Sequence, residues 1–137
     1  MKYKIYEDMN ADEASFVQQG LIEFADRFTG PRNYKEFGIV LRDEHGTVCG
    51  GIIGSTIWNW LRIDVLWLPE GLRGRGFGKR LLEYAEDLAR KRGCDSAMLD
   101  TFDFEARDFY EAHGYVVRSQ TDDFPPGHTH YRLTKGL

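Results

Sequence analysis

Apolar residues recur with two different periods along the chain, and the change of period separates predicted strands from predicted helices. Alternation over Tyr3–Tyr6 predicts a short first strand. A helical spacing follows, with apolar residues at positions 16, 17, 21, 24, 25 and 28, and it stops at Gly30-Pro31. Asn10 and Glu13 have the spacing of a capping box, so we expect this helix to begin directly after Asn10.

The remaining pattern predicts strands first, and then strands that alternate with helices. Two strand-like runs, Phe37–Leu41 and Thr47–Ile57, flank the turn sequence Asp43–Gly46 and indicate a hairpin. A third strand is expected from Leu61 to Leu68, followed by helices over 78–93 and 106–113 and by strands over 97–99, from 115 and over 131–133. This order favours an α/β (α+β) fold with a central mixed, mostly antiparallel sheet of six to seven strands and helices on both faces.

Composition is that of one folded domain over residues 1–137, and it excludes several classes of function. Hydrophobic residues make up 42% and charged residues 29%, which argues against disorder. The net charge of −4 disfavours a general nucleic-acid binder. We expect a cytoplasmic protein without a membrane partner, because the sequence shows neither a signal-peptide core nor a long apolar run. Cys49 and Cys94 have no neighbouring base in sequence, which argues against a cysteine nucleophile.

The most informative stretch is a basic, glycine-rich segment from Arg73 to Lys79, between the third strand and the next helix. Glycines at 74, 76 and 78 allow backbone N–H groups to turn toward one anion, and basic side chains at 73, 75 and 79 add positive charge. A Walker sequence would need glycine at Arg73 and a hydroxyl at Arg80, and the Gly-x-Gly-x-Gly spacing differs from the dinucleotide fingerprint. The alternative is a glycine-rich turn with solvated basic residues.

Two blocks of the sequence carry a resemblance to a known family. Arg73-Gly74-Arg75-Gly76-Phe77-Gly78 resembles the Arg/Gln-x-x-Gly-x-Gly/Ala signature of the GNAT superfamily of acyl-CoA-dependent N-acyltransferases, with Leu68 at the aliphatic position five residues before it. Residues 106–115, Ala-Arg-Asp-Phe-Tyr-Glu-Ala-His-Gly-Tyr, resemble the family's Ala-x-x-x-Tyr-x-x-x-Gly-Phe/Tyr helix. The expected order of elements agrees along essentially the whole chain, and small bacterial acetyltransferases of unknown substrate look most similar.

The resemblance implies an acetyl-CoA-dependent N-acetyltransferase with acetyl-CoA as cosubstrate and no metal. It implies that the pantetheine arm pairs with main-chain groups near Leu66 and Leu68, in a gap before the next strand. Tyr110 stands at the place of the family tyrosine that hydrogen-bonds the thioester sulfur and protonates the departing thiolate, although an ordinary core tyrosine is the alternative. The pyrophosphate site implied by the resemblance consists of Arg73, Gly74, Arg75, Gly76, Phe77, Gly78 and Lys79.

Asp64 is the candidate for the second catalytic residue. Alternation along the third strand predicts one face with Arg62, Asp64, Leu66 and Leu68, and it assigns Trp67 to the opposite, core face. Because Leu68 lies beside the thioester in the family, Asp64 would face the acceptor amine and bind it or relay its proton through water. A carboxylate paired with Arg62, or a base formed by water alone, is the alternative.

The acceptor itself is left open between a small-molecule amine and an exposed amino group. Trp58 and Trp60 would suit an apolar or cationic acceptor. His128 and His130 could line the acceptor side or act as a base, with a solvated or core position as the alternative, and no third metal ligand accompanies them. We expect no nucleic-acid partner, and a homodimer is compatible with the fold. A non-catalytic acyl-CoA-binding sensor is the alternative function, but the intact Tyr110 and glycine loop favour the enzyme.

Overall fold

The computed structural model describes residues 1–137 in two compact units, Met1–Arg32 and Asn33–Leu137. The first unit contains one helix, α1 (Ala11–Thr29). Its capping box is confirmed, since Asn10 Oδ1 accepts the N–H of Glu13 at 2.8 Å and Glu13 Oε1 accepts the N–H of Asn10 at 3.0 Å. The predicted strand over Tyr3–Tyr6 is wrong: these residues are irregular, because a strand needs a paired neighbour and this unit has no other strand.

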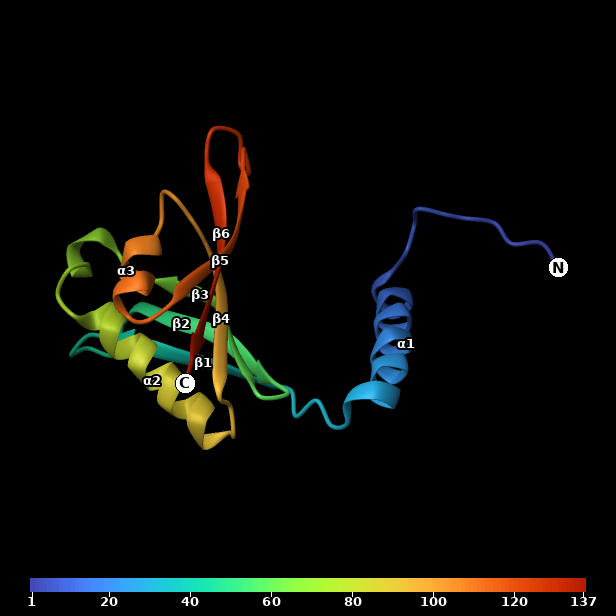
Figure 1. Ribbon diagram of the computed structural model, residues 1–137, viewed down its shortest axis with the longest axis horizontal. Coiled ribbons are helices and arrows are strands. Elements are labelled where there is room, and N and C mark those ends of the chain that lie inside the picture. Colours follow the sequence, from blue (N-terminus) through green and yellow to red (C-terminus); the bar gives the residue numbers. More distant parts are fainter. The chain divides into compact units, whose positions relative to one another are not determined.

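The second unit is built around a six-stranded sheet (Figure 1). Its strands are β1 (Lys35–Arg42), β2 (Val48–Ile57), β3 (Trp60–Trp67), β4 (Ser96–Phe102), β5 (Val116–Asp122) and β6 (Thr129–Gly136). They lie in the order β1-β2-β3-β4-β6-β5, and only β3 and β4 run parallel, which confirms the predicted mixed, mostly antiparallel sheet. The helical elements of this unit are η1 (Glu70–Leu72), α2 (Phe77–Lys91) and α3 (Arg107–Ala112).

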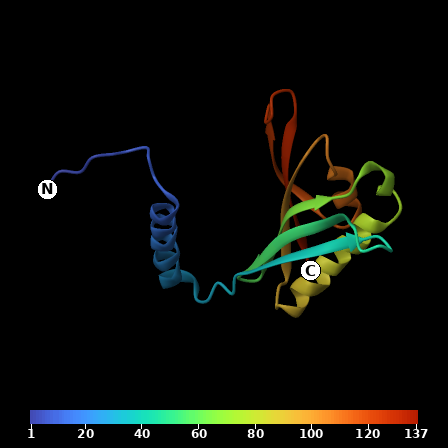
Figure 2. The same cartoon turned by 180° about the vertical axis from the view of Figure 1, so that it is seen from behind.

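Helix α2 covers one face of β1, β2 and β3 (Figures 1 and 2). Its buried residues Leu82, Ala85 and Ala89 belong to the same core as Ile52 of β2. Helix α3 adds Tyr110 to this core. Both helices of the second unit thus contribute to the core of the sheet, as predicted for a mixed sheet flanked by helices. No helix of the chain has both the length and the apolar character that a membrane span requires.

An extra residue on β3 shapes the centre of the sheet. Ile53 of β2 pairs with Val65, but the next residue, Gly54, pairs with Ile63. Asp64 therefore has no partner of its own and forms a β-bulge. Because side chains alternate along a strand, one extra residue transfers every later side chain to the other face.

This bulge overturns the prediction that Arg62, Asp64, Leu66 and Leu68 share a face. Leu66 pairs with the buried Ile52 on the α2 side, whereas Arg62 pairs with Ser55 on the side away from α2. Leu68 lies in the core with Leu66 packed against it. The expectation that Trp67 belongs to the core is wrong for the same reason, and its side chain is 55% exposed.

The parallel pairing of β3 with β4 is short. It ends at Ile63 and Leu99, although β3 continues to Trp67 and β4 to Phe102. Beyond this point the facing backbone groups of the two strands do not pair with each other. A gap therefore opens in the middle of the sheet, directly beside Asp64.

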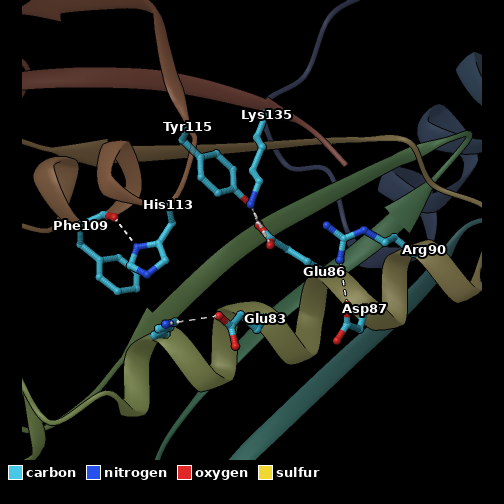
Figure 3. Close-up of polar contacts among 9 residues, drawn as sticks. Glu83, Glu86, Asp87, Arg90, Phe109, His113, Tyr115 and Lys135 are labelled. Atoms are coloured by element: carbon cyan, nitrogen blue, oxygen red, sulfur yellow. Dashed lines mark hydrogen bonds and ion pairs between the residues drawn. The ribbon is translucent and has the colours of Figure 1, made fainter.

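A buried polar cluster joins α2 to β6 and to the residue that precedes β5 (Figure 3). Glu86, only 4% exposed, accepts the hydroxyl of Tyr115 at 2.8 Å, and its two oxygens lie 2.9 and 3.0 Å from Nζ of Lys135. Burial and the negative charge of Glu86 raise the pKa of Tyr115, so this phenol stays protonated and keeps donating. Three polar groups from α2, the start of β5 and β6 thus satisfy one another inside the core.

We expect Glu86→Ala to lower the free energy of unfolding by about 3 kcal/mol, because it leaves an ammonium and a hydroxyl without their shared partner. Thermal or urea unfolding measures the loss. The matched control is Asp87→Ala on the same helix, which removes only an exposed pair with Arg90 and should cost less than about 0.5 kcal/mol. Equal losses for the two variants would contradict the stabilising role of the cluster.

Candidate active site

The glycine-rich segment forms the start of α2 and leaves the helix open to an anion. Gly74 and Gly76 have φ angles of 70° and 86°, in the left-handed region that glycine adopts without strain. Gly76 is the N-cap, and no side chain caps the helix. The first N–H groups of α2 therefore have no partner within the helix, and they point out from the positive end of its dipole.

Basic side chains concentrate positive charge around this helix start. Nε of Arg73 donates to the carbonyl oxygen of Leu68 at 3.0 Å and so fixes the loop to the end of β3. The guanidinium carbons of Arg75 and Arg80 lie 5.4 and 5.9 Å from the ring centroid of Phe77. Since no carboxylate pairs closely with these three arginines, their charge stays available to an anion.

A cavity of about 500 Å³, here called the loop cavity, lies beside the helix start. The end of β3, the glycine-rich loop and α3 line it with Leu66, Leu68, Arg73, Gly74, Gly76, Gly78, Lys79, Ala106, Phe109 and His113. Of the predicted pyrophosphate residues, Arg75 and Phe77 belong to the loop but do not line this cavity.

The α3 wall of the loop cavity is absent from the sequence prediction. His113 Nδ1 lies 2.7 Å from the carbonyl oxygen of Phe109, and the two rings pack with centroids 4.5 Å apart (Figure 3). The ring of Phe109 also lies against Gly78, where an added Cβ would meet it at 3.4 Å. The available signal was the spacing of residues 106, 109 and 113, which places three side chains on one helical face.

A second cavity, here called the gap cavity, occupies the space between β3 and β4 and measures about 360 Å³. It shares Leu66, Leu68, Arg73 and Ala106 with the loop cavity. Asp64 and Tyr110, the two predicted catalytic residues, both line it. The structure thus brings together a bulge residue of the sheet and a residue of α3 at the point where the strands part.

Tyr110 presents a protonated hydroxyl to the gap cavity. Its side chain is 6% exposed, and no hydrogen bond within the chain engages its hydroxyl oxygen. Burial, with a smaller contribution from the negative charge of Glu105, raises the pKa of Tyr110 to about 12. The group therefore remains a hydrogen-bond donor at every pH at which the protein is normally studied.

A third cavity, here called the face cavity, lies on the side of the sheet away from α2 and measures about 650 Å³. It shares Ile63, Asp64, Leu99 and Asp100 with the gap cavity. Its remaining walls are Ile57, Trp58, Trp60, Arg62, Met98 and Arg132. Because neighbouring cavities share lining residues, a series of spaces runs from the start of α2, through the gap, to the opposite face of the sheet.

Of the charged side chains at the junction of the gap and face cavities, one forms ion pairs within the chain and others do not. Asp100 accepts two hydrogen bonds from Arg132, at 2.8 and 3.1 Å, and lies 3.3 Å from Nε2 of His130. The hydrogen bond from Arg132 lowers the pKa of Asp100, so its carboxylate is ionised and its charge is balanced. Asp64 and Arg62, in contrast, take part in no hydrogen bond or ion pair within the chain.

The two candidate histidines lie outside these three cavities. His128 pairs with Asp103, with Nδ1 at 2.9 Å from Oδ1, and His130 lies beside Asp100. Neither histidine lines the cavity that holds Tyr110, although His130 contacts Asp100, which lines the gap and the face cavities. Nowhere in the chain do three His, Cys, Asp or Glu side chains gather in a way that could hold a metal ion.

Comparisons with known proteins agree with this geometry. A family model described as "Acetyltransferase (GNAT) family" matches residues 3–115. Blasticidin-S acetyltransferase from Streptomyces morookaense is 42% identical over 95 residues, which cover 69% of this chain and 70% of that protein. Acetyltransferase Atu2258 from Agrobacterium fabrum is 31% identical over 116 residues, or 85% of each chain. A crystal structure of an acetyltransferase from Bacillus cereus superposes with a TM-score of 0.91, at 31% identity and over 98% of both chains.

The geometry of the loop predicts that Gly76→Ala weakens the binding of coenzyme A about tenfold. A side chain at a φ of 86° costs about 1–2 kcal/mol, and rotation that relieves this strain turns the N–H groups away from the anion. Isothermal titration calorimetry measures the affinity. Gly71→Ala, in the same connection but with open space around the new Cβ and no positive φ, is the control and should bind as the wild type does. Unchanged affinity of Gly76→Ala would refute the role of this loop.

Proposed function

Because this chain belongs to the GNAT family of acetyltransferases, we propose that its cavities divide between acetyl-CoA and the acceptor amine. The chain is an acetyl-CoA-dependent N-acetyltransferase, and acetyl-CoA is its cosubstrate. The observation that carries the proposal is the series of shared cavities, with the open helix start at one end and the face cavity at the other. Acetyl-CoA occupies the loop and gap cavities, and the acceptor enters through the face cavity.

The donor side is suited to the two parts of coenzyme A in different ways. The pyrophosphate binds the unpartnered N–H groups at the start of α2, with Arg73 and Lys79 lining the same cavity and Arg75 in the same loop. The pantetheine arm lies in the gap, where β3 at Leu66 and Leu68 has an edge that β4 does not cover. An extended arm with amide groups can pair with such an edge as an added strand would.

Tyr110 acts on the leaving group. The amine nitrogen attacks the thioester carbonyl, a tetrahedral intermediate forms, and the carbon–sulfur bond then breaks as the carbonyl re-forms. Negative charge develops on sulfur, and the hydroxyl of Tyr110 donates a hydrogen bond to it and supplies the proton that makes the free thiol. The acceptor nitrogen loses two protons in all. One passes from the ammonium to Asp64 and on to solvent before the attack, and the second leaves the tetrahedral intermediate and replaces the proton that Tyr110 gives to sulfur, so the phenol is restored. The free hydroxyl at the wall of the gap cavity supports this role.

Asp64 acts on the acceptor. It borders both the gap and the face cavity, and no group within the chain neutralises its carboxylate. We assign it the binding of the acceptor ammonium and the removal of its proton, directly or through water. The face cavity has the size of a small-molecule site. With a relative named for a small-molecule antibiotic, this size favours a small-molecule amine as acceptor.

Tyr110→Phe should lower kcat about 100-fold, because the ring still packs in the core but the donor to sulfur is lost. The dissociation constant of coenzyme A should change little, since the loop is untouched. Steady-state release of free thiol and calorimetric titration measure the two quantities. Tyr84→Phe, an exposed position on α2, is the matched control. Wild-type turnover in Tyr110→Phe would refute the role of this residue.

The pH dependence follows from the raised pKa of Tyr110. A group with a pKa of about 12 is protonated below that pH, so the donor is retained up to pH 10. A tyrosine with the ordinary pKa of about 10 would be half ionised there. At saturating acetyl-CoA we therefore expect no fall in kcat between pH 8 and 10, after subtraction of spontaneous hydrolysis. A twofold loss near pH 10 that is absent from Tyr110→Phe would contradict this expectation.

A further inference from the structure

The face cavity carries two charges that the protein does not balance. Four charged side chains line it: Arg62, Asp64, Asp100 and Arg132. Asp100 and Arg132 neutralise each other in a two-bonded pair. Arg62 and Asp64 remain, one cation and one anion on the same strand, and neither has an ion-pair partner in the chain.

We propose that the acceptor is an amine that also bears an anionic group, such as a carboxylate, and that Arg62 binds this second group. The inference rests on the proposed function and specifies the acceptor of the same site. Asp64 lies where the face cavity meets the gap and so holds the ammonium next to the thioester, whereas Arg62 lines the face cavity alone. An acceptor with both charges satisfies both side chains, while a polycation would bring like charge to Arg62.

The bulge affects how the two charged side chains are presented by β3. Arg62 and Asp64 are two residues apart on β3, and both line the face cavity. Asp64 is the extra residue and borders the gap, so the two side chains do not have to follow regular alternation. An acceptor that carries its amine and its anion on one compact body can reach both side chains, because both line the same cavity.

The tryptophans at the turn between β2 and β3 supply a wall for the body of such a molecule. Trp58 has a φ of 51°, a conformation that bulky residues rarely adopt, and it lines the face cavity with Trp60. The next residue is held in place: Nδ2 of Asn59 donates to Asp95 at 2.6 Å, and the N–H of Asp95 donates to the carbonyl of Asn59 at 3.0 Å. The turn thus fixes an indole at the cavity, where it can stack on a planar or apolar group.

Other carboxylates that might indicate a polycationic acceptor are used within the β5–β6 hairpin. Asp123 accepts the N–H of Gly127 at 2.9 Å, and Asp122 accepts the hydroxyl of Thr129 at 3.2 Å. These groups stabilise the turn and do not line the face cavity. Among the side chains that line the face cavity, the charge left without an ion-pair partner is therefore one of each sign rather than acidic.

The test compares amines that share a body and a basicity but differ in the second group. The probes are the 3- and 4-(aminomethyl)benzoates, the corresponding benzamides, benzylamine and a diamine, 4-(aminomethyl)benzylamine. Release of free thiol from saturating acetyl-CoA is followed for the wild type, for Arg62→Gln and for Arg62→Glu. Arg118→Gln, an exposed arginine on β5, is the matched control.

We expect kcat/KM for a benzoate to exceed that for its benzamide, and Arg62→Gln to raise KM for the benzoate about tenfold with kcat and the benzamide unaffected. Arg62→Glu should shift the preference toward the diamine. Equal use of benzoate and benzamide, or equal losses for both in Arg62→Gln, would overturn the inference while the proposed function stands. No thiol release with any of these amines, although coenzyme A binds, would overturn this inference, whereas unchanged turnover in Tyr110→Phe or unchanged affinity in Gly76→Ala would overturn the proposed function.

Discussion

The central constraint in this structure is that β3 and β4 must pair at one end and separate at the other. The extra residue at Asp64 makes this compatible with a continuous sheet, because β3 keeps its hydrogen bonds to β2 on both sides of the bulge. The parallel pairing with β4 stops one residue earlier, at Ile63. The edge at Leu66 that β4 leaves free and the cavity that connects the two faces both lie where these two strands separate.

Much of the fold follows from local patterns in the sequence. The capping box at Asn10, the hairpin between β1 and β2 and the long helix before Gly93 are set by residues close together in the chain, and the structure has all three. The bulge is different, since Arg62 to Leu68 reads as unbroken alternation. The bulge is determined by how β3 pairs with β2 and by where its pairing with β4 ends. Both depend on segments that are distant in the sequence. The wrong prediction of the face of Leu66 and of the burial of Trp67 both follow from this bulge, which the sequence pattern does not reveal.

The candidate site also contains some residues that a contiguous motif predicts and others that only the tertiary structure brings together. The loop from Arg73 to Lys79 is a contiguous motif, so its position at a helix start could be predicted, and the second block similarly marked Tyr110. The pair formed by Asp100 and Arg132 joins residues 32 positions apart through the register of β4 and β6, and no spacing in the sequence reveals it. The wall formed by Phe109 and His113 required knowledge of which side of α3 faces the loop.

The passage through the sheet has one more consequence. The glycine loop and the tryptophan turn belong to different faces and share no lining residue. A molecule seated at the helix start leaves the other mouth open, so the order in which two ligands arrive is not imposed by one blocking the other. Substitutions at Met98, Trp58 or Arg132 can also remodel one entrance without disturbing the other. With this layout, related proteins can change the acceptor that they bind while they keep the same thioester donor.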